Sequence, residues 1–565
     1  MWGYNPFFFA GYPAGIYLET DNHWATLFNM ALGGILNKAL TFNLAVLIAF
    51  LLPPIFAYFS ADNFRLSKTG MLFMVIFSMF IICGDAIIRG FRQFGGYAFI
   101  LSSFMSLYSA SLLYLLLTEK RIRHLIFFTI SGSLALFVHV GTFIILAAMC
   151  APMLIVYFRE VKLKYIIWIS ISAAIILAIN SVWLHSYLKF LYMVDKNSGW
   201  CETYNVPYYS FIKVLGSEPP SVMIFCLSIA AILYSYFKAQ KRPVIMCLFF
   251  SSLIFFVLTF CGEKLGILIA HNSRFKIPLL ALMGLTISFA AEDWIKEKNF
   301  LFIATAFLTA LSFGFAPGGV RISYKFGYDM KDLNSILSYL KSSTNNTSRI
   351  HVQDSFRYPY YASHFPAIIP YATSREIVAG PYTSSFTKNE FTQFINDRIF
   401  NRKIHTITDQ KFKKYLELYN IRYFLVFSDN ARRFFDNNTM FKKVFWAGKY
   451  TIYEYTDAQD SYVYGSRATV KADYDKIVVK NATAGKTILK YHYIDTLRIK
   501  PENLKIGPVR LLDDPIPFIK VENWLCPYFI IYNEGLSESM INEDVNTSHI
   551  SPADRESITN WQPKK

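Results

Sequence analysis

Long apolar segments separated by short polar loops fill the chain up to about residue 317. A membrane-spanning helix needs about 20 apolar residues, and about ten segments of this kind can be placed. They lie near residues 39–60, 70–88, 96–117, 124–138, 141–158, 165–184, 221–237, 243–260, 276–291 and 299–316. The pattern therefore predicts an α-helical polytopic membrane domain of about ten spans over residues 39–317.

The apolar stretch from 124 to 158 is too long for one span. A single helix there would measure about 52 Å, whereas the hydrocarbon core of a bilayer is about 30 Å thick. Basic residues flank it on both sides, with Lys120 and Arg121 before it and Arg159 after it. We therefore predict two short spans joined by a turn at His139–Gly141.

Residues 1–38 precede the first predicted span. The segment from Trp2 to Trp24 is rich in aromatic residues, glycine and proline, and it lacks the basic start and uninterrupted apolar core of a signal peptide. Residues 22–38 have the character of a helix that lies along the membrane interface. We predict an outer loop followed by an interfacial helix in this segment.

The second half of the chain is polar and mixes helix and strand patterns. Helical periodicity at 330–342 and 411–421, with strands at 349–353 and 422–427, predicts an α/β domain over residues 318–459. Short strands follow at residues 476–480, 487–493, 517–522 and 528–533. Turn residues separate these strands, which is typical of an antiparallel β-sandwich, here over residues 460–537. The polar tail, 538–565, is predicted to be disordered.

Composition supports a membrane protein. The 565 residues are 54% hydrophobic, which is more than an ordinary soluble chain contains. The net charge of +17 raises the question of nucleic-acid binding. The sequence has no basic-aromatic module of the kind that binds nucleic acid, so we expect the lipid bilayer, and not nucleic acid, as a partner.

Basic residues gather in alternate loops, and this predicts the orientation. The loops near residues 65–68, 120–123, 159–164, 238–242 and 296–298 carry Lys and Arg, and all fall on one side of the predicted spans. The positive-inside rule makes that side cytoplasmic. An even number of spans then places the polar half outside, so we expect a multi-pass protein of the plasma or inner membrane with an extracytoplasmic C-terminal domain.

Several familiar site motifs are absent from the sequence. It has seven cysteines without a CxxC pair, which argues against a zinc site, and no Walker loop, HExxH or GxSxG motif. A bridge between Cys201 and Cys261 is an alternative to free thiols. Asp473–Asp475 matches the DxD pattern with which sugar-nucleotide enzymes hold a metal, but it begins a predicted strand, so we interpret it as a turn.

Three carboxylates lie at the predicted outer surface. Glu19 and Asp21 follow the aromatic loop, and Asp85 lies at the outer end of the second span. Such groups can deprotonate an acceptor hydroxyl or hold a divalent cation such as Mg²⁺ or Mn²⁺. The alternative is that they are ordinary solvated residues at span ends. We select them as catalytic candidates.

Cationic and aromatic residues at the same surface are candidates for substrate binding. Arg89, Arg92 and Arg274 can bind a phosphate in a bidentate manner, whereas the alternatives are an Asp85–Arg89 surface pair and an arginine reaching toward lipid headgroups. His23 and the aromatic Tyr12, which can stack on a sugar face, complete the set. His139 is interpreted as a turn residue.

Three segments of the membrane half resemble a known family. They are NPFFFAGYP at 5–13, GFRQFGG at 90–96 and SRF at 273–275, and they are similar to the polytopic domain called 6-pyruvoyl-tetrahydropterin synthase-related. That domain resembles the GT-C class of membrane glycosyltransferases. The resemblance implies a lipid-phosphate-linked sugar donor and an acidic catalytic residue in the first outer loop.

The polar half extends this resemblance. SREIVAGPY at 374–382, LYNIRYFLVF at 418–427, ILKYHY at 488–493 and DDPIPFI at 513–519 resemble the extracytoplasmic half of bacterial and archaeal proteins of this kind. One departure matters: in the family the acidic residue lies upstream of the NPxxxxGYP-like stretch, and here Met1 falls inside the loop. We therefore expect an N-terminally incomplete sequence or a remnant.

The first functional hypothesis is a GT-C-like glycosyltransferase. It would transfer a sugar from a polyprenyl-phosphate donor to an extracytoplasmic glycan, lipid or protein. Two alternatives are a transporter or flippase of lipid-linked glycans and a non-catalytic membrane scaffold that displays a surface domain. Whether a partner subunit completes the site is left open.

The predicted orientation can be tested with reporters fused after Lys565. Alkaline phosphatase, which is active only outside the cytoplasm, should be active at this position, and a fluorescent protein that matures only in the cytoplasm should be dark. A control fusion in the basic loop near residue 120 should give the opposite pair of signals. A bright cytoplasmic reporter after Lys565 would refute the orientation.

Overall fold

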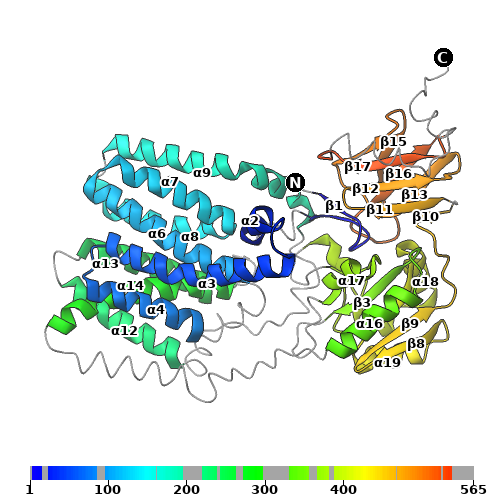
Figure 1. Cartoon of the computed structure of the whole chain (residues 1–565), viewed down its shortest axis with the longest axis horizontal. Coiled ribbons are helices and arrows are strands. Elements are labelled where there is room, and N and C mark those ends of the chain that lie inside the picture. The colour runs from blue at the N-terminus through cyan, green and yellow to red at the C-terminus, as the bar shows by residue number, and fades with distance from the viewer. Residues whose placement is uncertain are drawn as a thin grey trace. The chain divides into compact units, whose positions relative to one another are not determined.

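The protein divides into two compact units in its computed structural model. One comprises residues 1–17, 186–205 and 325–565, and the other comprises residues 18–185 and 206–324 (Figure 1). We call them the polar unit and the helical unit. The structure describes residues 3–14, 23–84, 96–160, 162–194, 219–237, 242–262, 272–296, 330–354, 365–380, 387–465, 468–523 and 526–536. The two units are a coarser division than the predicted domains, whose boundaries stay predictions.

Apolar helices make up the helical unit. They are α2 (His23–Leu32), α3 (Lys38–Asn63), α4 (Lys68–Gly84), α6 (Tyr97–Glu119), α7 (Ile122–Val138), α8 (Thr142–Val156), α9 (Leu163–Lys189), α12 (Pro219–Tyr236), α13 (Arg242–Phe260) and α14 (Lys276–Lys296). Each predicted span within the described residues coincides with one of these helices. The last predicted span, 299–316, lies outside the described residues.

Within the described residues, five helices are long and apolar enough to cross a membrane: α3, α6, α9 with its continuation to Met193, α13 and α14 with the preceding turn. They identify a multi-pass membrane protein, and the total of about ten spans stays a prediction. The split of the 124–158 stretch is confirmed, because α7 ends at Val138 and α8 begins at Thr142.

Two helices form the centre of the helical unit. The apolar windows of α6 and α14 are each 94% buried inside the protein, whereas that of α9 is 22% buried. Buried serines along α6 bond back to their own helix, and Ser109 Oγ also bonds Ser131 Oγ of α7 at 2.8 Å. Small side chains such as serine let helix backbones approach closely where no water is available, which suits α6 to a central position.

Two of the predicted cytoplasmic loops lie at one end of this unit, together with the end of α14. Glu119, at the end of α6, accepts hydrogen bonds from Arg65 at 3.3 Å and from His124 Nε2 at 3.0 Å, and Arg121 lies 3.6 Å away. Ser67 N donates to Glu292 near the end of α14 at 3.4 Å. The structure therefore gathers the loops near 65–68 and 120–123 and the end of α14 on one side, which we call the basic end.

A seven-stranded sheet forms the first half of the polar unit. Its strand order is β6-β5-β4-β3-β7-β9-β8. The strands are β3 (Arg349–Asp354), β4 (Phe394–Ile395), β5 (Arg398–Ile399), β6 (Arg402–Lys403), β7 (Ile421–Val426), β8 (Phe441–Ala447) and β9 (Tyr450–Tyr455). β3 runs parallel to β4 and β7, and the other pairs are antiparallel. The predicted α/β architecture is confirmed in this region.

Helices cover both faces of this sheet. They are α16 (Met330–Ser343), α17 (Phe365–Thr373), α18 (Asp409–Tyr419) and α19 (Asp429–Asp436). Alternate residues of a strand point to opposite faces. Accordingly, Leu425 of β7 packs in the cluster that holds α16 and α17, and its neighbour Phe424 packs in the cluster that holds α18 and α19.

Two four-stranded antiparallel sheets form a sandwich in the second half. Their orders are β10-β13-β16-β15 and β11-β12-β17-β14. The strands are β10 (Val463–Tyr464), β11 (Thr469–Asp473), β12 (Lys476–Lys480), β13 (Gly485–His492), β14 (Leu497–Lys500), β15 (Lys505–Val509), β16 (Phe518–Asn523) and β17 (Phe529–Asn533). Apolar residues of both sheets form one core. The predicted sandwich and the predicted turn at Asp473–Asp475 are both confirmed, since β11 and β12 form a hairpin there.

The N-terminal aromatic loop folds into the polar unit. Its strands β1 (Tyr4–Asn5) and β2 (Tyr12–Pro13) form a hairpin. Ile377 N donates to Phe7 O at 2.9 Å, and His492 N donates to Ala10 O at 2.7 Å, so the loop bonds both the α/β part and the sandwich. The side chain of Tyr4 is fully buried, and its hydroxyl donates to His492 O at 2.8 Å. The predicted outer-loop segment 1–38 is thus divided between the two units.

A buried ion pair joins the α/β part of the polar unit to the sandwich. Arg349 Nε of β3 lies 2.8 Å from Glu376 Oε2, and both side chains are almost completely enclosed. Arg349 Nη1 also donates to Tyr419 O at 3.0 Å and to Lys490 O of β13 at 2.7 Å. Tyr491 OH donates to Glu376 Oε1 at 2.6 Å. One guanidinium therefore holds three chain segments together.

We predict that Glu376→Ala strongly destabilises the polar unit. Removing one partner of a buried pair leaves an uncompensated charge, at a cost of about 3–5 kcal/mol. Amide hydrogen exchange of β3 and β13 in the full-length protein should accelerate by at least about a hundredfold. The matched control is Asp457→Ala, which breaks the exposed 3.3 Å pair with Lys413 and should leave exchange nearly unchanged. Equal exchange in both variants would contradict the role of the buried pair.

Candidate functional site

Five of the eight predicted site residues lie outside the described part of the chain. These are Glu19, Asp21, Asp85, Arg89 and Arg92. Their catalytic and substrate-binding roles stay predictions. The structure describes the other three, Tyr12, His23 and Arg274.

Tyr12 is a core residue of the polar unit. Its side chain is fully buried and meets the rings of Phe8 and Phe9 edge-on, at centroid distances of 6.2 and 5.8 Å. The same apolar cluster includes Ile350 of β3 and Ile377. A sugar-stacking role for Tyr12 stays a prediction, and it would require this ring to become exposed.

Arg274 lies at one end of the helical unit. It belongs to a short 3₁₀ turn, η3 (Asn272–Phe275), directly before α14. The ring of the next residue, Phe275, is buried and packs against Phe99 at the start of α6 and Phe255 of α13, at 6.0 and 6.2 Å. This packing holds the half-buried Arg274 at the end where α6 begins. The basic end lies where α6 finishes, so Arg274 is at the opposite end.

Two histidines lie at the same end as Arg274. His139, between α7 and α8, places its ring against Phe99 at 4.9 Å, and its Nδ1 accepts a hydrogen bond from Gly141 N at 2.8 Å. His23, the first residue of α2, packs its ring against Phe137 near the end of α7 and against Trp183 of α9, each at 5.0 Å. Both histidine side chains are buried. We call Arg274, His23 and His139 the arginine–histidine end.

His139 is the residue of this end that the sequence analysis did not select. It was interpreted as a turn residue, and the structure confirms that position. The sequence signal that points further is its place between two short apolar segments on the predicted outer side, the side that also receives Arg274. A residue at such a turn necessarily shares one end of the helical unit with the other outer loops.

The described residues contain no group of three or more His, Cys, Asp or Glu side chains that could hold a metal ion. The carboxylates that the sequence analysis assigned to metal binding lie outside these residues. A divalent metal therefore stays a prediction. Cys261 is a free thiol, which is the interpretation that the sequence analysis favoured.

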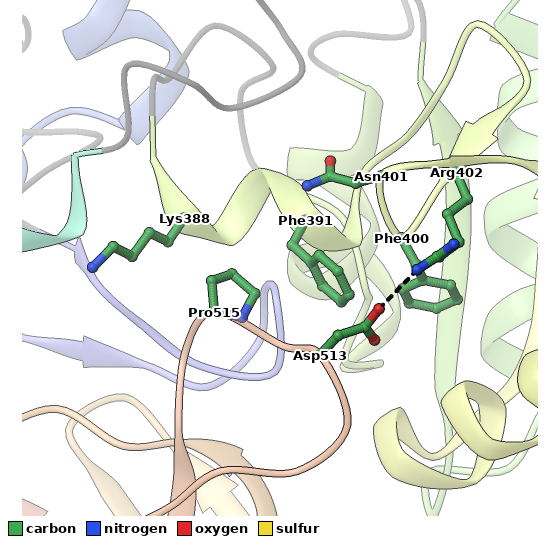
Figure 2. A pocket seen from close by; sticks show the side chains of 7 residues that line it. All are labelled: Lys388, Phe391, Phe400, Asn401, Arg402, Asp513 and Pro515. Carbon is green, nitrogen blue, oxygen red and sulfur yellow. Dashed lines mark hydrogen bonds and ion pairs between the residues drawn. The ribbon is translucent and has the colours of Figure 1, made fainter.

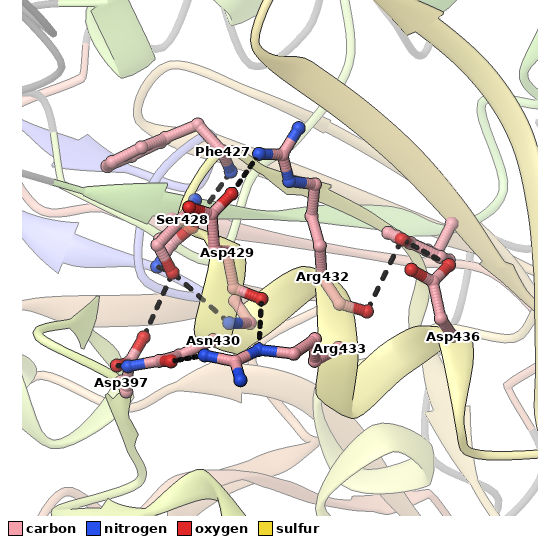
Figure 3. A network of polar contacts seen from close by, with 11 residues as sticks. Asp397, Phe427, Ser428, Asp429, Asn430, Arg432, Arg433 and Asp436 are labelled. Carbon is pink, nitrogen blue, oxygen red and sulfur yellow. Dashed lines mark hydrogen bonds and ion pairs between the residues drawn. The ribbon is translucent and has the colours of Figure 1, made fainter.

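A polar network lies at the carboxyl edge of the parallel strands in the polar unit, where open α/β sheets commonly bind ligands. The side-chain oxygen of Gln353, in β3, accepts from Phe427 N at 2.8 Å and from Ser428 N at 3.0 Å. Asp397, just after β4, accepts from Ser428 Oγ at 3.0 Å and from Asn430 Nδ2 at 2.8 Å. Figure 3 shows the side chains of Asp397, Ser428 and Asn430 pointing toward one another.

This network organises the start of α19. Ser428 is the N-cap of the helix, and its hydroxyl accepts from Ala431 N at 3.2 Å. Arg433 Nη2 donates to Asn430 Oδ1 at 2.5 Å, and Arg432 pairs with Asp429. These polar groups bond one another, and an N-cap hydroxyl stabilises a helix by about 1 kcal/mol. The network therefore has a structural explanation and requires no ligand.

The helices of the helical unit, with the arginine–histidine end, define a multi-pass helical membrane protein. Its large polar unit combines an α/β part with a β-sandwich. No protein-family model matches the sequence, and no curated protein sequence matches it. Solved structures provide the similarities that follow.

The chain is similar to the apo oligosaccharyltransferase of Archaeoglobus fulgidus, with a TM-score of 0.47 and 12% identity over 75% of this chain. It spans 63% of that protein's length. It is also similar to ArnT from Cupriavidus metallidurans in the apo state, with a TM-score of 0.46 and 12% identity over 79% of this chain and 89% of that one. The chain is similar as well to ArnT from Cupriavidus metallidurans bound to undecaprenyl phosphate. The TM-score is 0.42, and the identity is 11% over 78% of this chain and 89% of that one. Likeness at this level assigns no substrate to the chain.

Proposed function

We propose that the chain is an integral membrane glycosyltransferase of the GT-C kind. It transfers a sugar from a polyprenyl-phosphate donor to an extracytoplasmic glycan, lipid or protein. The observation that carries this proposal is the arginine–histidine end, where Arg274 is held beside α14 and opposite the basic end. The GT-C-like motifs in the sequence, one of which contains Arg274 itself, support the same assignment.

The position of Arg274 supports the donor class in this proposal. A polyprenyl phosphate keeps its tail in the hydrocarbon core, so its phosphate lies at the level of the headgroups. An arginine offers planar donors that match phosphate oxygens in a bidentate manner. Because the neighbouring Phe275 ring is locked between Phe99 and Phe255, the backbone that carries Arg274 is fixed at one end of the helices. In this proposal Arg274 binds the donor phosphate, and Arg89 and Arg92 assist.

The chemistry requires a base for the acceptor hydroxyl. In this proposal a carboxylate of the outer loops, Asp21, Asp85 or Glu19, accepts that proton as the hydroxyl attacks the anomeric carbon. A divalent cation, if one is used, would bind the same carboxylates and stabilise the leaving phosphate. His23 contributes to substrate binding. The polar unit binds the acceptor on the extracytoplasmic side.

A transporter or flippase is the second candidate. Transporters place charges near the midplane of their spans and use broken helices. In the described helices of the helical unit, charged residues lie near helix ends, as Lys68 and Glu292 do. This distribution favours an enzyme that works at the membrane surface. The third candidate is a non-catalytic scaffold. It differs from the glycosyltransferase because it would transfer no sugar.

A transfer assay tests the proposal directly. Purified full-length protein in lipid nanodiscs should release polyprenyl phosphate from at least one member of a panel of polyprenyl-phosphate sugars when membrane extract supplies the acceptor. Arg274→Ala should lower the rate by at least about thirtyfold, as expected when one partner of a charged contact is lost. Arg274→Lys should retain part of the activity.

The matched control is Arg65→Ala. Arg65 lies at the basic end, where Glu119 keeps Arg121 and His124 nearby, so the rate should stay close to that of the wild type. The proposal fails if no donor is turned over, or if Arg274→Ala is as active as Arg65→Ala. Movement of a lipid-linked glycan across proteoliposomes without any transfer would instead support the flippase.

A further inference from the structure

A cavity in the polar unit lies between the sheet-edge hairpin of the α/β part and a loop of the sandwich. Its volume is about 420 Å³, within the range of small-molecule sites. Figure 2 shows its lining. The lining residues are Lys388, Phe391, Phe400, Asn401, Arg402, Asp513 and Pro515.

The hairpin wall is fixed by a strained turn. β5 and β6 are joined by Phe400 and Asn401, whose φ angles of +52° and +56° are left-handed. A bulky residue rarely adopts this conformation. The Phe400 ring is fully buried and stacks on Tyr415 and Tyr419, at 4.3 and 5.4 Å. This stacking holds the turn, and the turn presents Asn401 and Arg402 to the cavity.

Two adjacent carboxylates fix the opposite wall. Asp514 is buried and accepts hydrogen bonds from Tyr419 OH, from Ile516 N at 2.8 Å and from His492 Nε2 at 3.1 Å. Asp513 turns toward the cavity, where Arg402 Nη2 and Lys411 Nζ each lie 3.1 Å from its Oδ2. The two walls are therefore bonded to each other through Asp513.

The cavity carries excess positive charge. Burial opposes ionisation of Asp513, but hydrogen bonds from Tyr415, Lys411 and Arg402 outweigh it and lower the pKa of its carboxyl to about 2. At neutral pH the negative charge of Asp513 therefore lies beside two cations, Arg402 and Lys411, and Lys388 lines the cavity on the far side of Pro515 (Figure 2). In the described part of the chain, Lys388 contacts the ring of Tyr192 at 5.9 Å and pairs with no carboxylate. Among the described residues, the three cations around the cavity therefore outnumber the carboxylates by two.

We propose that this cavity binds an anionic saccharide, whose carboxylate-bearing sugar residues place their charges near Arg402 and near Lys388 at the two sides of the cavity (Figure 2). Asn401 offers an amide to the sugar hydroxyls, and Pro515 offers an apolar surface to a ring face. The volume exceeds what a simple inorganic anion needs, which favours a sugar residue. The proposal goes beyond the transferase activity, because it concerns binding that occurs without turnover.

Binding can be measured on the full-length protein in nanodiscs of zwitterionic lipid by isothermal titration calorimetry. Trigalacturonate should bind, and maltotriose, which is neutral, should bind at least about tenfold more weakly. Lys388→Ala and Arg402→Ala should each weaken trigalacturonate binding by at least about tenfold, the scale of a lost hydrogen bond to a charged group. Added salt should also weaken the binding of trigalacturonate to the wild-type protein, because salt screens the attraction between charges.

Lys413→Ala is the matched control. Lys413 belongs to α18, as Lys411 does, but it pairs with Asp457 and does not line the cavity, so its removal should leave affinity unchanged. Melting curves should be alike for all three variants. Equal affinity for maltotriose would refute an anionic ligand, and equal competition by inorganic phosphate would refute a saccharide. Variants that bind trigalacturonate like the control would refute the location.

The calorimetry tests saccharide binding in the cavity, and the transfer assay tests the proposed function. A negative result in the first leaves the second valid. A full-length protein that transfers sugar but binds no trigalacturonate would retain the transferase proposal and reject the cavity. A protein that binds trigalacturonate through Lys388 and Arg402 without transferring sugar would support the cavity proposal and reject the transferase proposal. The two proposals can therefore fail separately.

Discussion

The buried guanidinium of Arg349 is the interaction on which the polar unit depends. An isolated charge in a protein interior is costly, so this arginine requires Glu376 and the carbonyls of Tyr419 and Lys490 to be in place at once. Those groups come from distant parts of the sequence. One buried charge therefore links the α/β part to the sandwich, beside the contacts of Asp513 and Asp514, and the N-terminal hairpin bonds the same region at His492.

The bilayer imposes the corresponding constraint on the helical unit. Every backbone polar group in hydrocarbon must be satisfied internally, so the chain crosses as helices and keeps its charges at the ends. The basic end is held around Glu119, and the other end is held by Phe99, which contacts both His139 and Phe275. One end thus gathers cations around Glu119, and the other carries Arg274, whose neighbour Phe275 packs on Phe99 as the buried His139 does.

Much of this arrangement was predictable from periodicity. The apolar segments predicted the helices, including the break at 139–141, and strand patterns predicted β3, β7 and the sandwich. Pairings across long sequence distances were not predictable: no local pattern indicates that the aromatic hairpin at 4–13 bonds His492, or that Arg402 meets Asp513. Strands β4, β5 and β6 have two residues each, too few for any periodicity. At the candidate site, the sequence identified Arg274 as a phosphate-binding candidate. The sequence pattern around His139 indicated only a turn residue.

The measurement that tests the central claim most directly is photo-crosslinking with a polyprenyl phosphate that carries a diazirine next to its phosphate. Peptide mapping of the full-length protein in nanodiscs should locate adducts in the segment around Arg274 and in the loop between α4 and α6. Excess unlabelled polyprenyl phosphate should suppress them. Adducts confined to the basic end around Arg65 and Lys120, or adducts that unlabelled lipid does not suppress, would contradict a donor site at the arginine–histidine end.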